Sequence, residues 1–146
     1  MSYTIILEQI YLLSWSIYLG GMLLFSIFGI FNSDKPEAIS LQFQKFGVIF
    51  GLSLGAALLS KILFHGLDVG HYYPRNLNEV LGFGFAFLTW LSNMILEVWT
   101  LDPIRKRHKG LLPASFDIDT AEIRFLRHLW LHSVILLGTQ LSFGLM

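Results

Sequence analysis

The sequence predicts an all-α integral membrane fold, a four-helix antiparallel bundle with both termini on the non-cytoplasmic side. Composition is the first observation: 54% of the 146 residues are hydrophobic, the mean hydropathy is +0.61, and 14% are charged, against roughly a quarter in soluble proteins. The second is four apolar runs, each about long enough for a helix to cross roughly 30 Å of hydrocarbon. The third is that basic residues gather between alternate runs.

The four apolar runs predict helices within a single domain, residues 1–146, at about 5–31, 46–65, 79–101 and 120–146. A backbone in lipid must satisfy its own hydrogen bonds, so runs of this length are expected to be helical. The first run has no basic leader and no small-residue cleavage site, and Glu8 interrupts it. We therefore expect this helix to remain in the mature protein.

Local signals mark two helix ends. Asp102 followed by Pro103 predicts that the third helix stops there, because a proline disfavours helical backbone at the residue before it. Asp119 to Glu122 has the spacing of an N-cap followed by an acidic third residue. The fourth helix is thus expected to begin in the cytosol, two turns before the lipid.

The basic residues orient the chain. Eight of the ten lie on the side of the predicted loops 32–45 and 102–125, namely Lys35, Lys45, Arg105, Lys106, Arg107, Lys109, Arg124 and Arg127. Lys61 and Arg75 are the other two. Cytoplasmic loops carry an excess of Lys and Arg, so both termini are expected outside and both basic loops inside. The expected location is a bacterial cytoplasmic (inner) membrane, with the lipid bilayer as the first partner.

Small residues predict where helices approach closely. Gly47, Gly51 and Gly55 recur every four residues on the second helix, a spacing that forms a groove for a neighbouring backbone. Gly20 and Gly21 in the first helix offer a partner surface. Packing within the bundle is favoured over a dimer interface, although the spacing is compatible with both.

Ionisable residues at membrane depth are costly and mark candidate sites. The outer candidate cluster is Glu8, Lys61 and His65. Glu8 and Lys61 have opposite charge and similar depth, which favours an ion pair between the first and second helices. The alternative is that Lys61 extends its ammonium to the headgroups and pairs with nothing.

The inner candidate cluster combines Asn93 and Glu97 of the third helix with Arg124, His128 and His132 of the fourth. Four-residue spacing places each set on one helix face. We expect Glu97 to contact His128 or Arg124. A structural hydrogen-bond network is the favoured interpretation because such bonds are common between membrane helices, and a proton or cation site is the alternative.

Cofactor signals are weak. His128 and His132 at four-residue spacing suit one metal ion, but the sequence offers no third ligand beyond Glu97, which leaves metal binding open. His65 lies at a different depth from both, so two histidines cannot ligate one haem, and no cofactor is expected. The chain has no cysteine, hence no thiolate site. Its zero net charge gives no support for nucleic-acid binding.

Several short motifs occur in one order along the chain. They are WSIYLGGMLLF at residues 15–25, Gln42 with Phe46, Leu101-Asp102-Pro103 followed by Arg105, and Phe125-Leu126-Arg127-His128 followed by Ser133. Together they are similar to motifs of the transmembrane protein 205 family. The resemblance implies a four-helix membrane architecture and supplies no catalytic activity.

The expected function is that of a non-enzymatic, multi-pass membrane protein that acts by packing or by binding a partner. That partner is a second copy or another membrane protein. One alternative is a small transporter or metal-handling protein that uses Glu97, His128 and His132. A second alternative is a haem-containing oxidoreductase, which is disfavoured because the histidines lie at different depths.

Overall fold

The computed structural model describes residues 2–146, and that range contains helices and loops but no β-strand. The elements in chain order are α1 (Tyr3–Phe31), α2 (Pro36–Val69), α3 (Leu77–Met94), the π-helical segment η1 (Ile95–Leu101), α4 (Asp102–His108) and α5 (Ile118–Leu145). The predicted all-α class is confirmed.

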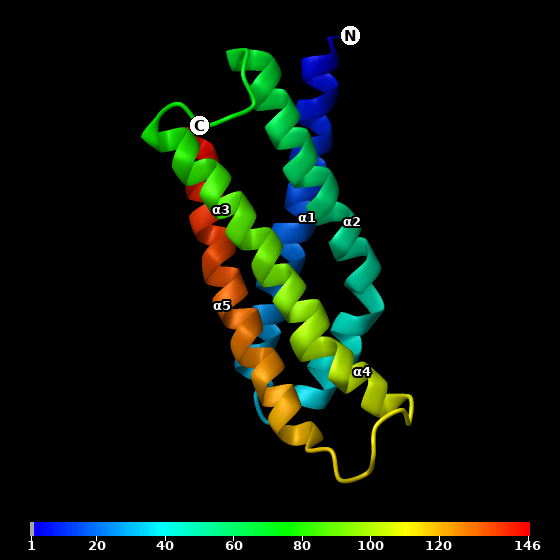
Figure 1. The fold of residues 1–146 in the computed structure, drawn as a ribbon. Helices are drawn as coiled ribbons and strands as arrows, with labels where there is room; N and C mark the ends of the chain where they lie inside the picture. Colours follow the sequence, from blue (N-terminus) through cyan, green and yellow to red (C-terminus); the bar gives the residue numbers. More distant parts are fainter. Residues whose placement is uncertain (1) are drawn as a thin grey trace.

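The long helices lie side by side and run alternately up and down (Figure 1). α1 packs along α2, while α5 packs against both α3 and α1. The N and C labels lie at one end of the molecule, and α4 lies toward the other (Figure 1). The loop that joins α1 to α2 spans only residues 32–35, and α2 begins at Pro36, a residue favoured in the first turn of a helix.

One helix continues from Leu77 to His108 through three elements, so the predicted stop at Asp102-Pro103 is wrong. The N–H of Asp102 donates to the carbonyl of Glu97, five residues back, which is the wider π-helical spacing. Pro103 then occupies the first turn of α4, where its missing N–H and fixed φ are tolerated. The proline therefore sits at a change of helix type instead of an end.

The start of α5 also differs from the prediction. Its N-cap is Asp117, not Asp119. One carboxylate oxygen of Asp117 accepts the backbone N–H of Thr120 at 3.1 Å, and the other accepts the Thr120 hydroxyl at 2.6 Å. These bonds satisfy an N–H that the first turn leaves free. They also hold the pKa of the Asp117 carboxyl below its usual value.

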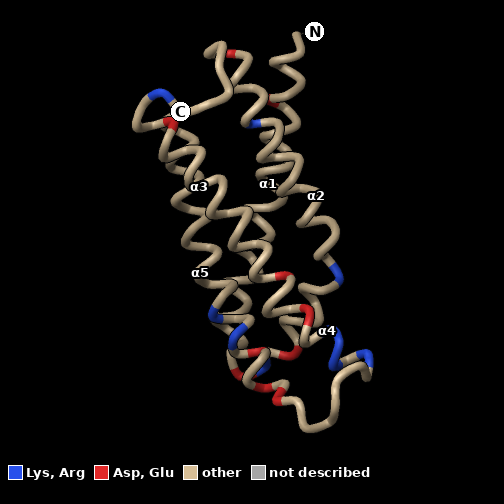
Figure 2. Tube along the Cα trace, in the orientation of Figure 1, with Lys and Arg blue, Asp and Glu red and all other residues tan. Residues whose placement is uncertain are grey.

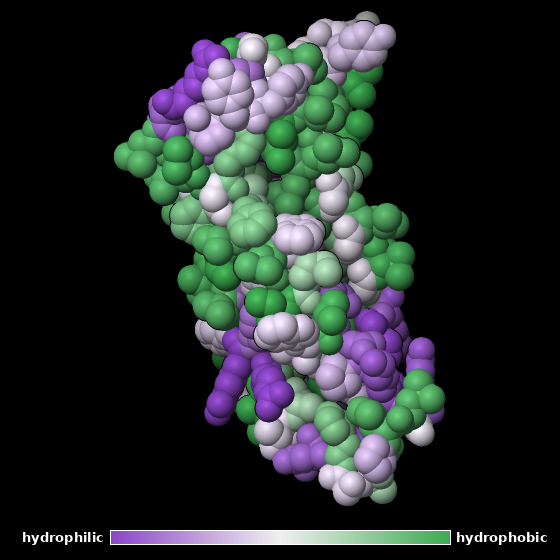
Figure 3. All heavy atoms as spheres, viewed as in Figure 1, coloured by the Kyte–Doolittle hydropathy of each residue, from purple (hydrophilic) through white to green (hydrophobic). Residues whose placement is uncertain are grey.

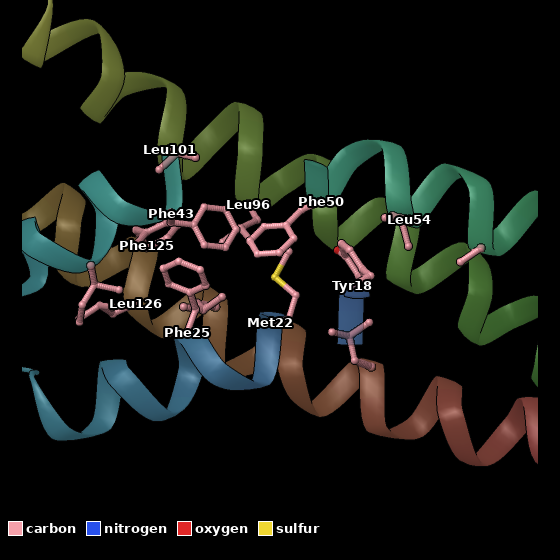
Figure 4. Close-up of a cluster of buried hydrophobic side chains, with 14 of the residues drawn as sticks. Tyr18, Met22, Phe25, Phe43, Phe50, Leu54, Leu96, Leu101, Phe125 and Leu126 are labelled. Atoms are coloured by element: carbon pink, nitrogen blue, oxygen red, sulfur yellow. The ribbon is translucent and has the colours of Figure 1, made fainter. Parts of the chain in front are cut away.

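The core is aromatic where three helices meet (Figure 4). Phe25 of α1 and Phe125 of α5 each pack edge-to-face on Phe43 of α2, with ring centroids 5.2 Å apart in both pairs. Met22 is fully buried beside them. Edge-to-face pairs add to the stabilisation from buried area, so this layer fixes the spacing of α1, α2 and α5.

Three helices are long and apolar enough to cross a membrane: Tyr3–Phe31, Pro36–Val69 and Leu77–His108. Only 22% of the most apolar window is buried in each of the first two, so most of their apolar side chains face outward. Figure 3 shows hydrophobic surface between more polar ends. An exposed apolar area of this extent requires an apolar medium or a partner.

Charged residues gather toward the end of the molecule that holds α4 (Figure 2). Acidic residues accompany the basic ones there, and Lys106 pairs with Asp102 at 2.8 Å. The opposite end carries few charges (Figure 2). Lys and Arg, which cluster in the sequence, therefore also cluster at one end of the folded molecule.

Candidate functional site

A buried hydrogen-bond network connects α1, α3 and α5, and Tyr18 is at its centre. The Tyr18 side chain is 0% exposed, and its hydroxyl lies 2.8 Å from Oδ1 of Asn93 and 2.6 Å from Nε2 of His132. Nδ1 of His132 lies 2.9 Å from the hydroxyl oxygen of Ser92. Nε2 of His128 lies 3.0 Å from the Ser92 carbonyl oxygen. We call Tyr18, Ser92, Asn93, His128 and His132 the inner network.

The acceptors fix the direction of each bond in the inner network. A carbonyl oxygen accepts, so Nε2 of His128 donates to Ser92. The Tyr18 hydroxyl donates its one hydrogen to Asn93, so its oxygen accepts the Nε2–H of His132. Nδ1 of that neutral ring then accepts the Ser92 hydroxyl. With these assignments each donor hydrogen faces an acceptor, and no two hydrogens face each other.

Helix periodicity places these side chains. His128 and His132 are four residues apart on α5 and therefore share a face. Ser92 and Asn93 are adjacent on α3 and bond to different helices, α5 and α1 respectively. Tyr18 projects from α1 between them. Three helices are thus joined at one level.

Further hydrogen bonds between helices lie outside the inner network. Thr89 of α3 bonds to Thr139 of α5 at 2.7 Å, both side chains being fully buried. Ser26 of α1 bonds to Ser133 of α5 at 2.5 Å. The indole of Trp15 donates to the Gln140 carbonyl oxygen. These pairs join the same three helices above and below the network.

The structure corrects part of the predicted inner cluster. It brings Asn93, His128 and His132 together, but Glu97 bonds to Arg105 at 3.4 Å. The expected contact of Glu97 with His128 or Arg124 is therefore wrong. The physical reason is η1, which begins at Ile95 and changes the residue spacing just before Glu97. Arg124 is exposed on the surface of α5.

Sequence reasoning missed Tyr18 and Ser92. Tyr18 lies in an apolar run, where an aromatic residue is usually part of the core. Its signal is the phenolic hydroxyl, which usually has a hydrogen-bond partner when it is buried. Ser92 lies one turn after Thr89, so a count of small hydroxyl residues along α3 would have found it.

A second buried cluster connects α2 to the start of α3. Nε2 of His65 lies 3.3 Å from Oε1 of Glu79, and Nε2 of His71 lies 3.6 Å from the same oxygen. The other Glu79 oxygen accepts the backbone N–H of Arg75 at 2.6 Å. Asn76 caps α3 by accepting the N–H of Glu79 at 2.9 Å. Glu79 therefore joins the start of α3 to His65, near the end of α2.

The predicted ion pair between Glu8 and Lys61 is wrong. Glu8 is exposed, and no ion pair within 4.0 Å joins the two residues. The Lys61 ammonium lies instead 5.3 Å from the ring centroid of Tyr11 and 5.6 Å from that of Phe143. Aromatic faces attract a cation, and these two rings come from α1 and α5. His65, the third member of the predicted outer cluster, pairs with Glu79.

The prediction that Gly47, Gly51 and Gly55 pack against a neighbouring helix of the same chain is partly wrong. A Cβ on Gly21 would overlap the Phe50 ring, and one on Gly47 would lie 3.4 Å from Glu97. Gly21 therefore allows close approach, whereas the position of Gly47 has room for a Cβ in ordinary van der Waals contact. A Cβ added to Gly20, Gly51 or Gly55 would meet no atom within 4 Å, because these three glycines are exposed and face away from the neighbouring helices.

Within residues 2–146, no group of three or more His, Cys, Asp or Glu side chains is arranged to hold a metal ion. His128 and His132 each direct a ring nitrogen at Ser92 instead.

Comparison with protein-family models, curated proteins and solved structures finds no match for this chain. Its fold and site define a class: an all-helical protein with three helices suited to a membrane and polar side chains paired inside the helix cluster.

Proposed function

We propose that this chain is a multi-pass protein that crosses the bilayer four times as an antiparallel bundle. The two termini are non-cytoplasmic, and the membrane is a bacterial cytoplasmic membrane. The fourth crossing is made by α5, which has 28 residues and thus a length of about 42 Å. It lies along α3 and α1 (Figure 1). The gathering of Lys and Arg at one end supports the orientation.

The molecular role we propose is non-enzymatic: the protein acts by packing and by binding a partner in the membrane, either a second copy or another membrane protein. The inner network carries this proposal. His132 bonds to both Tyr18 and Ser92, so the polar groups of these residues serve to hold helices together. Bonds of this kind between membrane helices contribute about 0.6 kcal/mol on average and up to about 1.7 kcal/mol. The outward apolar faces of the helices are then available to bind the partner.

The position of Glu97 weakens the transporter alternative. That alternative needs an acidic group beside His128 and His132, and Glu97 pairs with Arg105 instead.

We also propose that the chain is a divergent member of the transmembrane protein 205 family. This proposal is supported by three residues of the motifs that carry the resemblance. Trp15, His128 and Ser133 each bond to a residue on another helix.

The role is tested with Tyr18→Phe and His132→Gln, measured against wild type for accumulation, thermal unfolding in detergent and the phenotype of a deletion strain. A structural network predicts that the phenotype follows the amount of folded protein. Loss of the phenotype at full accumulation and unchanged stability would overturn the proposal and favour transport. Topology is tested separately by C-terminal fusions to alkaline phosphatase and to a fluorescent protein that matures in the cytoplasm. Active phosphatase is expected, and fluorescence would contradict the orientation.

A further inference from the structure

An open groove of about 600 Å³ lies between α1 and α2. Its wall is apolar and includes Leu24 and Phe28 of α1 and Phe46 of α2, which are exposed. Its lining becomes polar at one end, where the two helices are joined by a short loop and Asn32 and Lys35 meet it. The groove is thus amphipathic along its length.

The length of the groove matches one leaflet. From Gly21 to Asn32, the C-cap of α1, its lining spans eleven helical steps, or about 16 Å at 1.5 Å per step. Half of the hydrocarbon core of a bilayer is about 15 Å. A single acyl chain that starts at the polar end would therefore reach the apolar end near the bilayer midplane.

Among the described residues that line the groove, Lys35 alone is charged, and it lies at the polar end. Lys35 lines the groove and takes part in no ion pair within 4.0 Å among residues 2–146. Its acidic sequence neighbours Asp34 and Glu37 do not line the groove. The amide nitrogen of Asn32 donates one of its two hydrogens to the carbonyl of Phe28. A headgroup at this end therefore meets a free ammonium and the side chain of Gln42.

We propose that this groove is a binding site for one anionic phospholipid of the leaflet at the end of the molecule that holds α4. One acyl chain lies against Leu24, Phe28 and Phe46, and the phosphate lies on Lys35. Basic pockets between membrane helices on the cytoplasmic side favour such headgroups. The inference rests on the proposed membrane crossing, which a separate measurement tests.

The experiment uses the full chain reconstituted into nanodiscs that contain equal amounts of phosphatidylglycerol and phosphatidylcholine. The protein is then extracted into mild detergent, and the retained lipids are counted by native mass spectrometry. We expect about one phosphatidylglycerol per chain, in preference to phosphatidylcholine. Equal retention of the two lipids, or preferential retention of added oleate, would overturn the proposal.

Two matched pairs of variants localise the site. Lys35→Ala should lower phosphatidylglycerol retention about fivefold, the effect of one basic residue near an anionic headgroup. Lys45→Ala removes the same charge from an exposed position outside the groove and should leave retention unchanged. Ala38→Trp fills the groove and should abolish retention, whereas Val48→Trp adds the same bulk at a 76% exposed position outside it. Equal effects within either pair would contradict the site.

Failure of the membrane proposal gives a different result. A chain that does not cross the bilayer would be released from membranes by alkaline carbonate. A chain that resists carbonate but shows no lipid preference would refute the lipid site alone.

Discussion

The hydroxyl of Tyr18 lies 2.6 Å from Nε2 of His132, and this contact joins α1 to α5 across 114 positions of sequence. Both side chains are fully buried. Since the Tyr18 hydroxyl also donates to Asn93, one phenol holds three helices at one level. Its removal should therefore affect the helix assembly as a whole.

Tyr18→Phe should lower the free energy of unfolding by about 1–2 kcal/mol, because Asn93 and His132 each lose a partner while the ring volume is kept. Thermal unfolding in detergent, followed by circular dichroism, measures the loss. Tyr3→Phe is the control because Tyr3 is 83% exposed. Equal melting temperatures for the two variants would show that the hydroxyl contributes nothing.

A double-mutant cycle of Tyr18→Phe and His132→Gln should give a coupling free energy between about 0.6 kcal/mol, the average for bonds between membrane helices, and about 1.7 kcal/mol, the maximum. The same cycle between Tyr18→Phe and His108→Gln should give zero, because His108 is exposed at the end of α4. Additive effects of Tyr18→Phe and His132→Gln would contradict the direct contact.

The free energy of unfolding should fall as pH rises from about 4.5 to about 7 because of Glu122. This residue lies in the first turns of α5, before the apolar stretch that begins at Leu126. Burial, followed by the nearby carboxylates of Glu37 and Asp119, raises the pKa of the Glu122 carboxyl to about 7. The folded state thus binds a proton that the unfolded state releases at lower pH, and deprotonation destabilises the fold. One Glu122 oxygen also lacks a hydrogen-bond partner.

Glu122→Gln should accordingly raise the melting temperature above pH 7 and leave it nearly unchanged below about pH 4.5. Unfolding at pH 4 and pH 8 measures the difference. Asp34→Asn serves as the control since Asp34 is exposed and is not a cause of the Glu122 shift. A melting temperature that is lower than wild type at pH 8 would contradict the assignment.

Adjacent glycines should respond in opposite ways. Gly21→Ala forces a Cβ into the Phe50 ring, and overpacking of this kind costs about 1–3 kcal/mol. Gly20→Ala meets open space and should be neutral or stabilising by up to about 1 kcal/mol, the helix propensity gained. Chemical denaturation of both variants gives the comparison. A loss at Gly20 equal to that at Gly21 would indicate that the outward face is covered by another molecule.

The predictable part of the structure came from periodicity. Apolar runs gave the all-helical class, and the four-residue spacing of His128 and His132 correctly placed both on one face. Apolar runs do not mark helix ends, however, because helices extend beyond the residues that match hydrocarbon. For that reason α2 begins ten residues before the predicted start at 46.

The errors arose where a contact depends on more than charge and spacing. Glu8 and Lys61 have opposite charges, but they form no ion pair within 4.0 Å, and the ammonium lies over the rings of Tyr11 and Phe143. Glu97 has the right spacing from Asn93 for an α-helix, but the backbone between them changes to π-helix. Neither an aromatic pocket from distant helices nor a change of helix type has a signature in the local sequence.

The π-helical segment η1 lets one continuous helix face two sets of neighbours. Asn93, just before it, bonds toward α1, whereas Glu97, within it, lies against Gly47 of α2. An extra residue in one turn offsets all later side chains by about 100°. A single-residue deletion between 95 and 101 would remove this extra residue and convert the turn to α-helix, so α4 and its basic residues would keep their present faces. The same deletion within α3 would instead turn every later side chain by about 100° about the helix axis.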